Sequence, residues 1–364
     1  MLRSLIFSIS LAATPAIAQL ATSAGNLTVT SVVSGLNAPW GFGFLPGGQI
    51  ILTEREGELY LITPGQGAVE VSGAPEVVAQ GQGGLLDVLV PRDFAETREL
   101  FFTYAKRQGR GAGTAVAKGR LSGDGTTLTG LETIFEMAPG TSGGRHFGSR
   151  LVEARDGTLY LTIGDRGERP SAQDLSIEAG SVVRITRDGA IPADNPFVDR
   201  NGAQPGIWSL GHRNPQGMAM DAEGNIWTVE HGAAGGDEIN LVQRGVNYGW
   251  PVISYGRHYS GGKIGEGTEK PGLEQPEFYW DPSIAPSGMM IYSGKLWPEW
   301  RGDIFVGSLK FDMISRLERG SRLTEAERIE SDETLRVRDI REAPDGSIWF
   351  LSVGQGALYR VTPS

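Results

Sequence analysis

Short runs of apolar and β-branched residues recur along the chain, and most of them follow a tight-turn sequence. The turns contain Gly47-Gly48, Asp156-Gly157, Glu223-Gly224, Gly302-Asp303 and Asp345-Gly346. Gly-Gly and Asp-Gly pairs between β-type runs are typical of hairpins. Several of the runs return into a second short strand, and no long stretch has helical periodicity. The pattern therefore predicts repeated antiparallel units.

These units are numerous enough to suggest a closed all-β architecture. The region 85–121 fits the pattern without a clean turn, and with it the chain has six units. Repeated four-stranded units predict a six-bladed β-propeller with loop insertions, in one domain over 19–364. We expect 27–33 to pair with the C-terminal strands and close the ring, and 190–206 and 253–280 to form loops. A β-sandwich or two all-β domains are the alternatives.

The N-terminus has the composition of an export signal. Arg3 precedes an apolar run at 5–13, and Ala16 and Ala18 form an A-x-A cleavage site. This pattern predicts a signal peptide at 1–18, cleaved after Ala18, and a periplasmic or secreted protein. The apolar run is shorter than the ~20 residues that span a bilayer, so no stable membrane insertion is expected.

Composition narrows the possible partners. The 364 residues include 53 glycines, in keeping with many turns, and no cysteine. The formal net charge of −10 disfavours binding to nucleic acid or to anionic membranes. In such an acidic chain, a local cluster of cations would indicate a site for an anionic ligand.

Candidate chemistry lies in glycine-rich turns and at strand ends. His146 stands among glycines, and a histidine has the unperturbed pKa that suits a base near neutrality. Arg213, Lys310, Arg336 and Arg338 lie in units that a propeller brings around one axis, where they could bind several carboxylates. A solvated histidine and scattered surface cations are the simpler interpretation.

Longer motifs strengthen the functional interpretation. The chain resembles the soluble quinoprotein sugar dehydrogenases (the glucose/sorbosone dehydrogenase family), particularly the periplasmic aldose sugar dehydrogenases. The resemblance covers nearly all of the mature chain. The segments that carry it are GQGGLLDV (81–88), GGRHFGSRL (143–151), GHRNPQGMA (211–219), EHGAAGGDEINL (230–241), NYGWP (247–251), HYSG (258–261), PSIAPSGMMIY (282–292), SLK (308–310) and RVRDI (336–340).

The resemblance implies a six-bladed propeller that binds pyrroloquinoline quinone (PQQ) and calcium and oxidises aldoses at C1 to lactones. It makes His146 the base that takes the C1 hydroxyl proton while hydride passes to the quinone. Arg213 would stabilise the reduced quinone, and an external acceptor would take the electrons. The residues implied to hold the PQQ carboxylates and quinone oxygens are Gln82, Arg213, Asn214, Tyr259, Lys310, Arg336 and Arg338.

The resemblance also implies two calcium sites. The backbone carbonyls of Gly232 and Ala233 would bind the ion that polarises the quinone. Glu238 and Tyr248 would bind a second, structural ion. From the residues alone, the acidic pair at 237–238 is equally a solvated turn or a weak calcium site, because it lacks a D-x-D-x-D-G loop.

Two residues depart from the family pattern. The glucose enzymes have an acidic residue before the histidine, where this chain has Arg145, and Ala233 replaces a usual proline. Sugar preference therefore cannot be transferred from the glucose enzymes. A calcium-dependent propeller lactonase and a non-catalytic sugar-binding propeller remain alternative functions. The preferred aldose, the electron acceptor and the choice between monomer and homodimer stay open.

Overall fold

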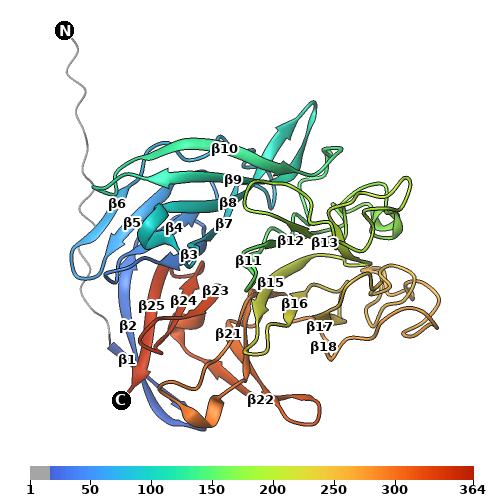
Figure 1. Ribbon diagram of the computed structural model, residues 1–364. Coiled ribbons are helices and arrows are strands. Elements are labelled where there is room, and N and C mark those ends of the chain that lie inside the picture. Colours follow the sequence, from blue (N-terminus) through green and yellow to red (C-terminus); the bar gives the residue numbers. More distant parts are fainter. Residues whose placement is uncertain (1–16) are drawn as a thin grey trace.

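Six antiparallel sheets form a closed ring around a central axis (Figure 1). The structure, a computed structural model, describes residues 17–364. The first strand of each blade lies nearest the axis and contacts the first strands of the neighbouring blades. The predicted all-β, six-bladed propeller is confirmed.

Each of the first five blades has four strands. Blade 1 contains β3 (Pro39–Phe44), β4 (Ile50–Glu54), β5 (Leu59–Thr63) and β6 (Gly67–Glu70). Blade 2 contains β7 (Leu85–Leu89), β8 (Glu99–Gln108), β9 (Gly111–Leu121) and β10 (Leu128–Glu136). Blade 3 contains β11 (Leu151–Glu153), β12 (Leu159–Ile163), β13 (Ser181–Ile185) and β14 (Ile207–Leu210).

The remaining blades follow the same plan until the last. Blade 4 contains β15 (Pro215–Met220), β16 (Ile226–Glu230), β17 (Asp237–Val242) and β18 (Phe278–Trp280). Blade 5 contains β19 (Pro286–Ile291), β20 (Ile304–Ser308), β21 (Met313–Arg319) and β22 (Leu323–Glu330). Blade 6 contains β23 (Val337–Glu342), β24 (Ile348–Ser352), β25 (Ala357–Pro363), β2 (Gly25–Ser34) and β1 (Ile17–Thr22).

Blade 6 joins the two ends of the chain. Strand β2 pairs antiparallel with β25, with Leu27 opposite Pro363 and Thr30 opposite Arg360, as expected for 27–33. Strand β1 then covers the outer edge of β2. The predicted signal peptide falls mostly on residues 1–16, which lie outside the described residues. Within 17–364, no helix is long and apolar enough to cross a membrane.

The turn signals mark the hairpins between the first and second strands of five blades. Blade 2 is the exception, because the short helix α1 (Phe94–Thr97) lies between β7 and β8. Three 3₁₀ segments, η1 (Arg169–Gln173), η2 (Pro298–Trp300) and η3 (Asp332–Thr334), lie in other connections. Aromatic side chains pack between blades; Trp300, Phe305 and Phe350, for example, share one buried cluster of blades 5 and 6.

The expected insertions are only partly loops. Residues 190–206 form turns without a strand, as predicted. The expectation for 253–280 is wrong at its end, because β18 pairs with β17 and places Trp280 opposite Asp237. Trp280 is buried in the core between blades 4 and 5, which gives this short segment a reason to join the sheet.

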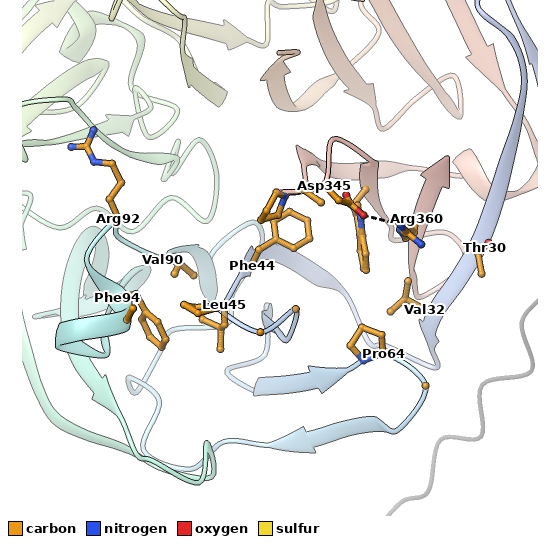
Figure 2. A pocket seen from close by; sticks show the side chains of 18 of the residues that line it. Thr30, Val32, Phe44, Leu45, Pro64, Val90, Arg92, Phe94, Asp345 and Arg360 are labelled. Atoms are coloured by element: carbon orange, nitrogen blue, oxygen red, sulfur yellow. Dashed lines mark hydrogen bonds and ion pairs between the residues drawn. The ribbon is translucent and has the colours of Figure 1, made fainter. Parts of the chain in front are cut away.

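The two ends of the innermost strands differ in character. At their carboxyl ends, between blades 6, 1 and 2, lies a hollow of about 870 Å³ (Figure 2). Phe44, Leu45, Val90 and Phe94 line it. We call it the apolar hollow. At the amino ends, the loops instead bring polar and cationic side chains together.

Candidate active site

A second cavity, of about 550 Å³, lies at the amino ends of the innermost strands, and we call it the cationic cavity. Trp40, Gln216 and Arg338 reach it from β3, β15 and β23 near the start of each strand. Lys310 reaches it from the end of β20, which runs antiparallel to β19. Its other polar lining residues are Arg55, Gln82, Asn214, His231 and Arg336.

Three of the four cations of this cavity lack acidic partners; the fourth, Arg55, pairs with Glu56 at 3.1 Å. Within residues 17–364, Lys310, Arg336 and Arg338 form no ion pair, and no Asp or Glu lines the cavity. Arg338 donates from Nη1 to Gln216 Oε1 at 2.9 Å. Burial, with the charges of Arg150 and Arg336, lowers the pKa of Arg338 to about 9. A partly buried, unpaired cation is costly, so this arrangement favours an anionic ligand.

His146 lies beside these cations on the loop that precedes β11. Its Nδ1 lies 2.6 Å from Asp165 Oδ1, and its side chain is only 12% exposed. Asp165 also accepts from the backbone N–H of Gly167 at 2.7 Å and from Trp250 Nε1 at 2.8 Å. An ionised carboxylate can only accept, so Nδ1 carries the proton and Nε2 keeps its lone pair.

The surroundings keep this imidazole neutral. Burial lowers the pKa of His146, and the charge of Arg213 and then that of Arg145 lower it further, whereas Asp165 acts in the opposite direction. Burial raises the pKa of Asp165, but its bonds with His146, Gly167 and Trp250 lower it more, so the carboxyl is ionised. A neutral imidazole beside a carboxylate is the arrangement of a general base.

Two of the predicted amides hold the His146 loop. Gln82 Oε1 accepts from the backbone N–H of His146 at 2.6 Å. Asn214 Oδ1 accepts from the backbone N–H of Gly148 at 3.3 Å. The loop needs this support because His146 itself has a positive φ of 54°. Both amides therefore hold the His146 loop as well as line the cavity.

Arg213 lies next to the cationic cavity rather than in its lining. Its Nη1 donates to the carbonyl of His231 at 3.1 Å, and its guanidinium carbon lies 5.4 Å from the centre of the Trp250 ring. Burial first, and then the charges of Arg213 and Arg338, lower the pKa of His231 to about 3. The structure thus brings Arg213 close to both histidines.

A void of about 10 Å³ beyond Arg213 is lined by Glu230, Gly232, Glu238 and Tyr248. A space of this size holds one water molecule or ion. Burial and the nearby Glu230 carboxylate raise the pKa of Glu238 well above its usual value. A divalent cation would relieve this repulsion. Within 17–364, no three His, Asp or Glu side chains cluster to hold a metal, so carbonyls would have to contribute.

Comparison with known proteins identifies the family of this chain. The family model for glucose/sorbosone dehydrogenase matches residues 36–360. The chain belongs to the glucose/sorbosone dehydrogenase family. It is 46% identical over 336 residues to the aldose sugar dehydrogenase YliI of Escherichia coli (strain K12), covering 90% of this chain and 91% of the relative.

Solved structures of family members share the whole fold. The soluble aldose sugar dehydrogenase from Escherichia coli, in its apo-form, superposes with a TM-score of 0.90 and 43% identity, covering 93% of this chain and all of that one (100%). The PQQ-bound aldose sugar dehydrogenase from Streptomyces coelicolor has a TM-score of 0.75 and 26% identity, covering 94% and 100% of the two chains. The resemblance predicted from the motifs is confirmed.

The other predicted residues of this sugar dehydrogenase homologue are less closely gathered. Tyr259 is 78% exposed and does not line the cationic cavity. The Tyr248 hydroxyl donates to the carbonyl of Leu241 and accepts from the backbone N–H of Gln243. The oxygen that Tyr248 could offer a metal is therefore its backbone carbonyl. The buried Ala233 accepts from the backbone N–H of Arg257 at 2.8 Å through its carbonyl.

Sequence reasoning missed several residues that complete the site. Asp165 and Trp250 support the imidazole, and Arg55, Gln216 and His231 line the cationic cavity. Asp165 lies two residues after the end of β12, and His231 directly follows β16. Polar residues within two positions of the end of a blade's second strand were the signal that could have identified both.

Proposed function

We propose that this protein is a PQQ- and calcium-dependent dehydrogenase that oxidises aldose sugars at C1 to lactones and passes the electrons to an external acceptor. One observation carries the proposal: a cavity lined by unpaired cations lies beside a neutral imidazole that is oriented by a buried carboxylate. The catalytic residues are His146 and Arg213. The PQQ-bound relative supports the choice of cofactor.

The lining of the cationic cavity fits PQQ, which is a planar tricarboxylate. Lys310, Arg336 and Arg338 would bind its carboxylates through charge-assisted hydrogen bonds. Gln82 and Asn214 line the same cavity and would donate to its polar atoms, and Tyr259 would approach from the exposed loop. Bound PQQ supplies the two-electron acceptor for the hydride of the C1–H bond.

His146 performs the proton transfer. Loss of hydride from C1 leaves positive charge on that carbon, so the hydroxyl proton must leave in the same step. Nε2 of the neutral imidazole accepts this proton. The Asp165 carboxylate, 2.6 Å from Nδ1, stabilises the resulting imidazolium, and the positive Arg213 nearby stabilises negative charge that develops on the acceptor.

Calcium would bind beside the cavity through oxygen ligands. The carbonyls of Gly232 and Ala233 would hold one ion, and Glu238 with the carbonyl of Tyr248 a second. Support for the ion at Glu238 and Tyr248 comes from the ion-sized void that these residues line together with Gly232, and from the raised pKa of Glu238. Hard cations prefer carboxylate and carbonyl oxygens.

The lactonase alternative is disfavoured by the charge of the cavity. A calcium-dependent hydrolase of that type needs carboxylates in its central pocket, whereas in residues 17–364 the lining has cations and no carboxylate.

The mature chain is proposed to be a single domain over 19–364, exported to the periplasm after removal of 1–18. Whether it is a monomer or homodimer is left to measurement.

The test is reconstitution of the purified apo-protein. Titration with PQQ and calcium is expected to give a saturable change in the quinone absorption spectrum and dye-linked oxidation of aldoses. The proposal would fail if the reconstituted protein bound no PQQ and oxidised no aldose. Sugar binding without electron transfer to any dye would favour the non-catalytic alternative, and lactone hydrolysis without PQQ would favour the hydrolase.

A further inference from the structure

The catalytic imidazole has a second group of cations around it, apart from those that face the PQQ carboxylates. Arg145 directly precedes His146 on an exposed part of the loop. Within residues 17–364 it forms no ion pair, and its charge contributes to the lowered pKa of His146. Its Nε lies close against Gly167, where a Cβ would come within 2.6 Å. Arg145 thus stands beside the base without a carboxylate partner.

Arg169, at the start of η1, is the next member of this group. Its guanidinium carbon lies 5.4 Å from the centre of the Trp250 ring, the same ring that Arg213 approaches. Its Nη1 lies 3.0 Å from His258 Nδ1. An arginine can only donate, so this histidine nitrogen accepts. Arg169 forms no ion pair within the described part of the chain.

The two groups of cations come from different blades. Arg55, Lys310, Arg336 and Arg338 reach the cationic cavity from blades 1, 5 and 6 and suffice for the three carboxylates of PQQ. The cations at 145, 169 and 213 come from the loops of blades 3 and 4 around the imidazole.

Little negative charge balances the group around the imidazole. Asp165 is already bonded to His146 and Trp250. Glu168, Asp174 and Glu178 are the other acidic residues of the connection 164–180, and Glu168, next to Arg169, is exposed and unpaired in residues 17–364. Calcium would add further positive charge. In a chain of net charge −10, Arg145, Arg169 and Arg213 thus gather positive charge on this side of the imidazole, and a neutral sugar carries no charge to pair with it.

On the basis of the proposed function, we infer that the preferred substrates are acidic aldoses, in which C1 is free and the far end of the sugar carries a carboxylate. C1 enters toward His146, and the carboxylate is bound by Arg145 and Arg169 at the mouth. The bond changes are those of a neutral aldose: the C1 hydroxyl gives its proton to His146, the C1–H bond gives hydride to the bound quinone, and a lactone forms. The distant carboxylate takes no part in them.

The experiment compares matched sugars on the PQQ- and calcium-loaded enzyme. Glucose is paired with glucuronate and galactose with galacturonate, and glucose 6-phosphate serves as a phosphate arm. We expect kcat/KM to be at least about 10-fold higher for each uronate than for its neutral partner, mostly through KM. The preference should fall as KCl is raised, because salt screens exposed charges.

The substitution Arg145→Gln is expected to reduce the uronate-to-neutral ratio of kcat/KM by about 5–10-fold, less than for a fully buried pair because Arg145 stays exposed. Arg169→Gln should act in the same direction. Using the ratio cancels any change in the basicity of His146. Arg322→Gln, at an exposed and unpaired arginine between β21 and β22, is the matched control and should change neither ratio nor activity.

The outcomes separate this inference from the proposed function. Equal or better turnover of the neutral sugars, or an unchanged ratio in both arginine variants, would overturn the inference and leave the dehydrogenase intact. Stronger preference for the phosphate arm than for the uronates would overturn the choice of carboxylate. Loss of activity on every aldose, with PQQ bound, would instead contradict the proposed function.

Discussion

The cationic cavity and the apolar hollow lie at opposite ends of the same innermost strand, β3. Trp40 lines the first and Phe44 the second. The apolar hollow is larger, at about 870 Å³ against about 550 Å³, and charges at its rim are paired, as in Asp345 with Arg360 at 2.7 Å (Figure 2). The smaller cavity has unpaired cations. Unsatisfied charge, rather than volume, distinguishes the candidate active site.

The lengths of the connections explain this difference. At the carboxyl ends of the innermost strands, most hairpins are tight, such as the turn between β11 and β12 that contains Gly157. At the amino ends, the chain makes a long connection at 164–180 in blade 3, and part of the blade 4 insertion, with Tyr248 and Trp250, also reaches this end. Long loops over a rigid scaffold have room for polar side chains, and binding residues concentrate there.

Removal of the imidazole beside the cationic cavity is expected to have the largest effect on activity. His146→Ala is expected to lower kcat by about 10²–10⁴-fold, the usual contribution of a general base. PQQ binding should persist, because the cations of the cavity are untouched. Stopped assays with a redox dye measure kcat, and the quinone spectrum measures binding. Activity near that of the wild type would mean that another group takes the proton.

Asp165→Asn tests the support of the base. Asparagine cannot accept bonds from His146, Gly167 and Trp250 at once, and it provides no charge for the imidazolium. We expect a loss of about 10²-fold in kcat, within the range of acid–base contributions. Asp165 raises the pKa of His146, so its loss should lower that pKa further and shift the acidic limb of the pH–kcat/KM profile to lower pH. A shift to higher pH would contradict the assignment.

Arg338→Gln tests the effect of removing an unpaired charge from β23, and a matched variant on the same strand tests the removal of a paired charge. Loss of one charge-assisted bond should weaken PQQ binding by about 10–100-fold, while the apo-protein keeps or gains stability because a buried, repelled cation is removed.

The matched variant is Arg341→Gln, three residues along β23. Arg341 pairs with Asp87 at 2.5 Å and with Asp339 at 2.9 Å. Its loss should destabilise the apo-protein by about 3 kcal/mol, because two buried carboxylates lose one of their two cationic partners and are left to share Arg150. Spectral titration with PQQ and denaturant unfolding of the apo-proteins measure the two effects. Equal destabilisation by both substitutions would contradict the assignment of Arg338 as unpaired and Arg341 as paired.

The sequence predicted the fold well because the hairpins depend on local turn chemistry. The Asp-Gly pair at 156–157 leads directly into β12, and the alternating residues of β2 pair with β25. Strand β18 was missed because three residues after a glycine- and proline-rich loop give too short a pattern. Its register depends on the burial of Trp280 between blades, which is a tertiary contact.

The sequence predicted the cations of the site better than the contacts that support His146. Lys310 and Arg338 could be placed together once a ring was inferred, since both lie at strand ends. The bond between Trp250 and Asp165 joins residues 85 apart in the chain, from two different connections. No local pattern encodes such a contact. Tyr259 shows the converse, because a motif indicated a cofactor contact for a side chain that is 78% exposed.

The smallest expected effect concerns the apolar hollow. Leu45 is buried in the cluster shared by blades 1 and 2, so Leu45→Ala should lower the free energy of unfolding of the apo-protein by about 2 kcal/mol, at the low end for a buried leucine because the hollow already adjoins it. Leu131→Ala, at a leucine that is 41% exposed, is the control and should cost under about 0.5 kcal/mol. Because Leu45 lies at the far end of the innermost strands, its loss should leave kcat and the Kd for PQQ within twofold of wild type. Weakened PQQ binding would show that the two ends of the ring are coupled, and the separation between scaffold and site would fail.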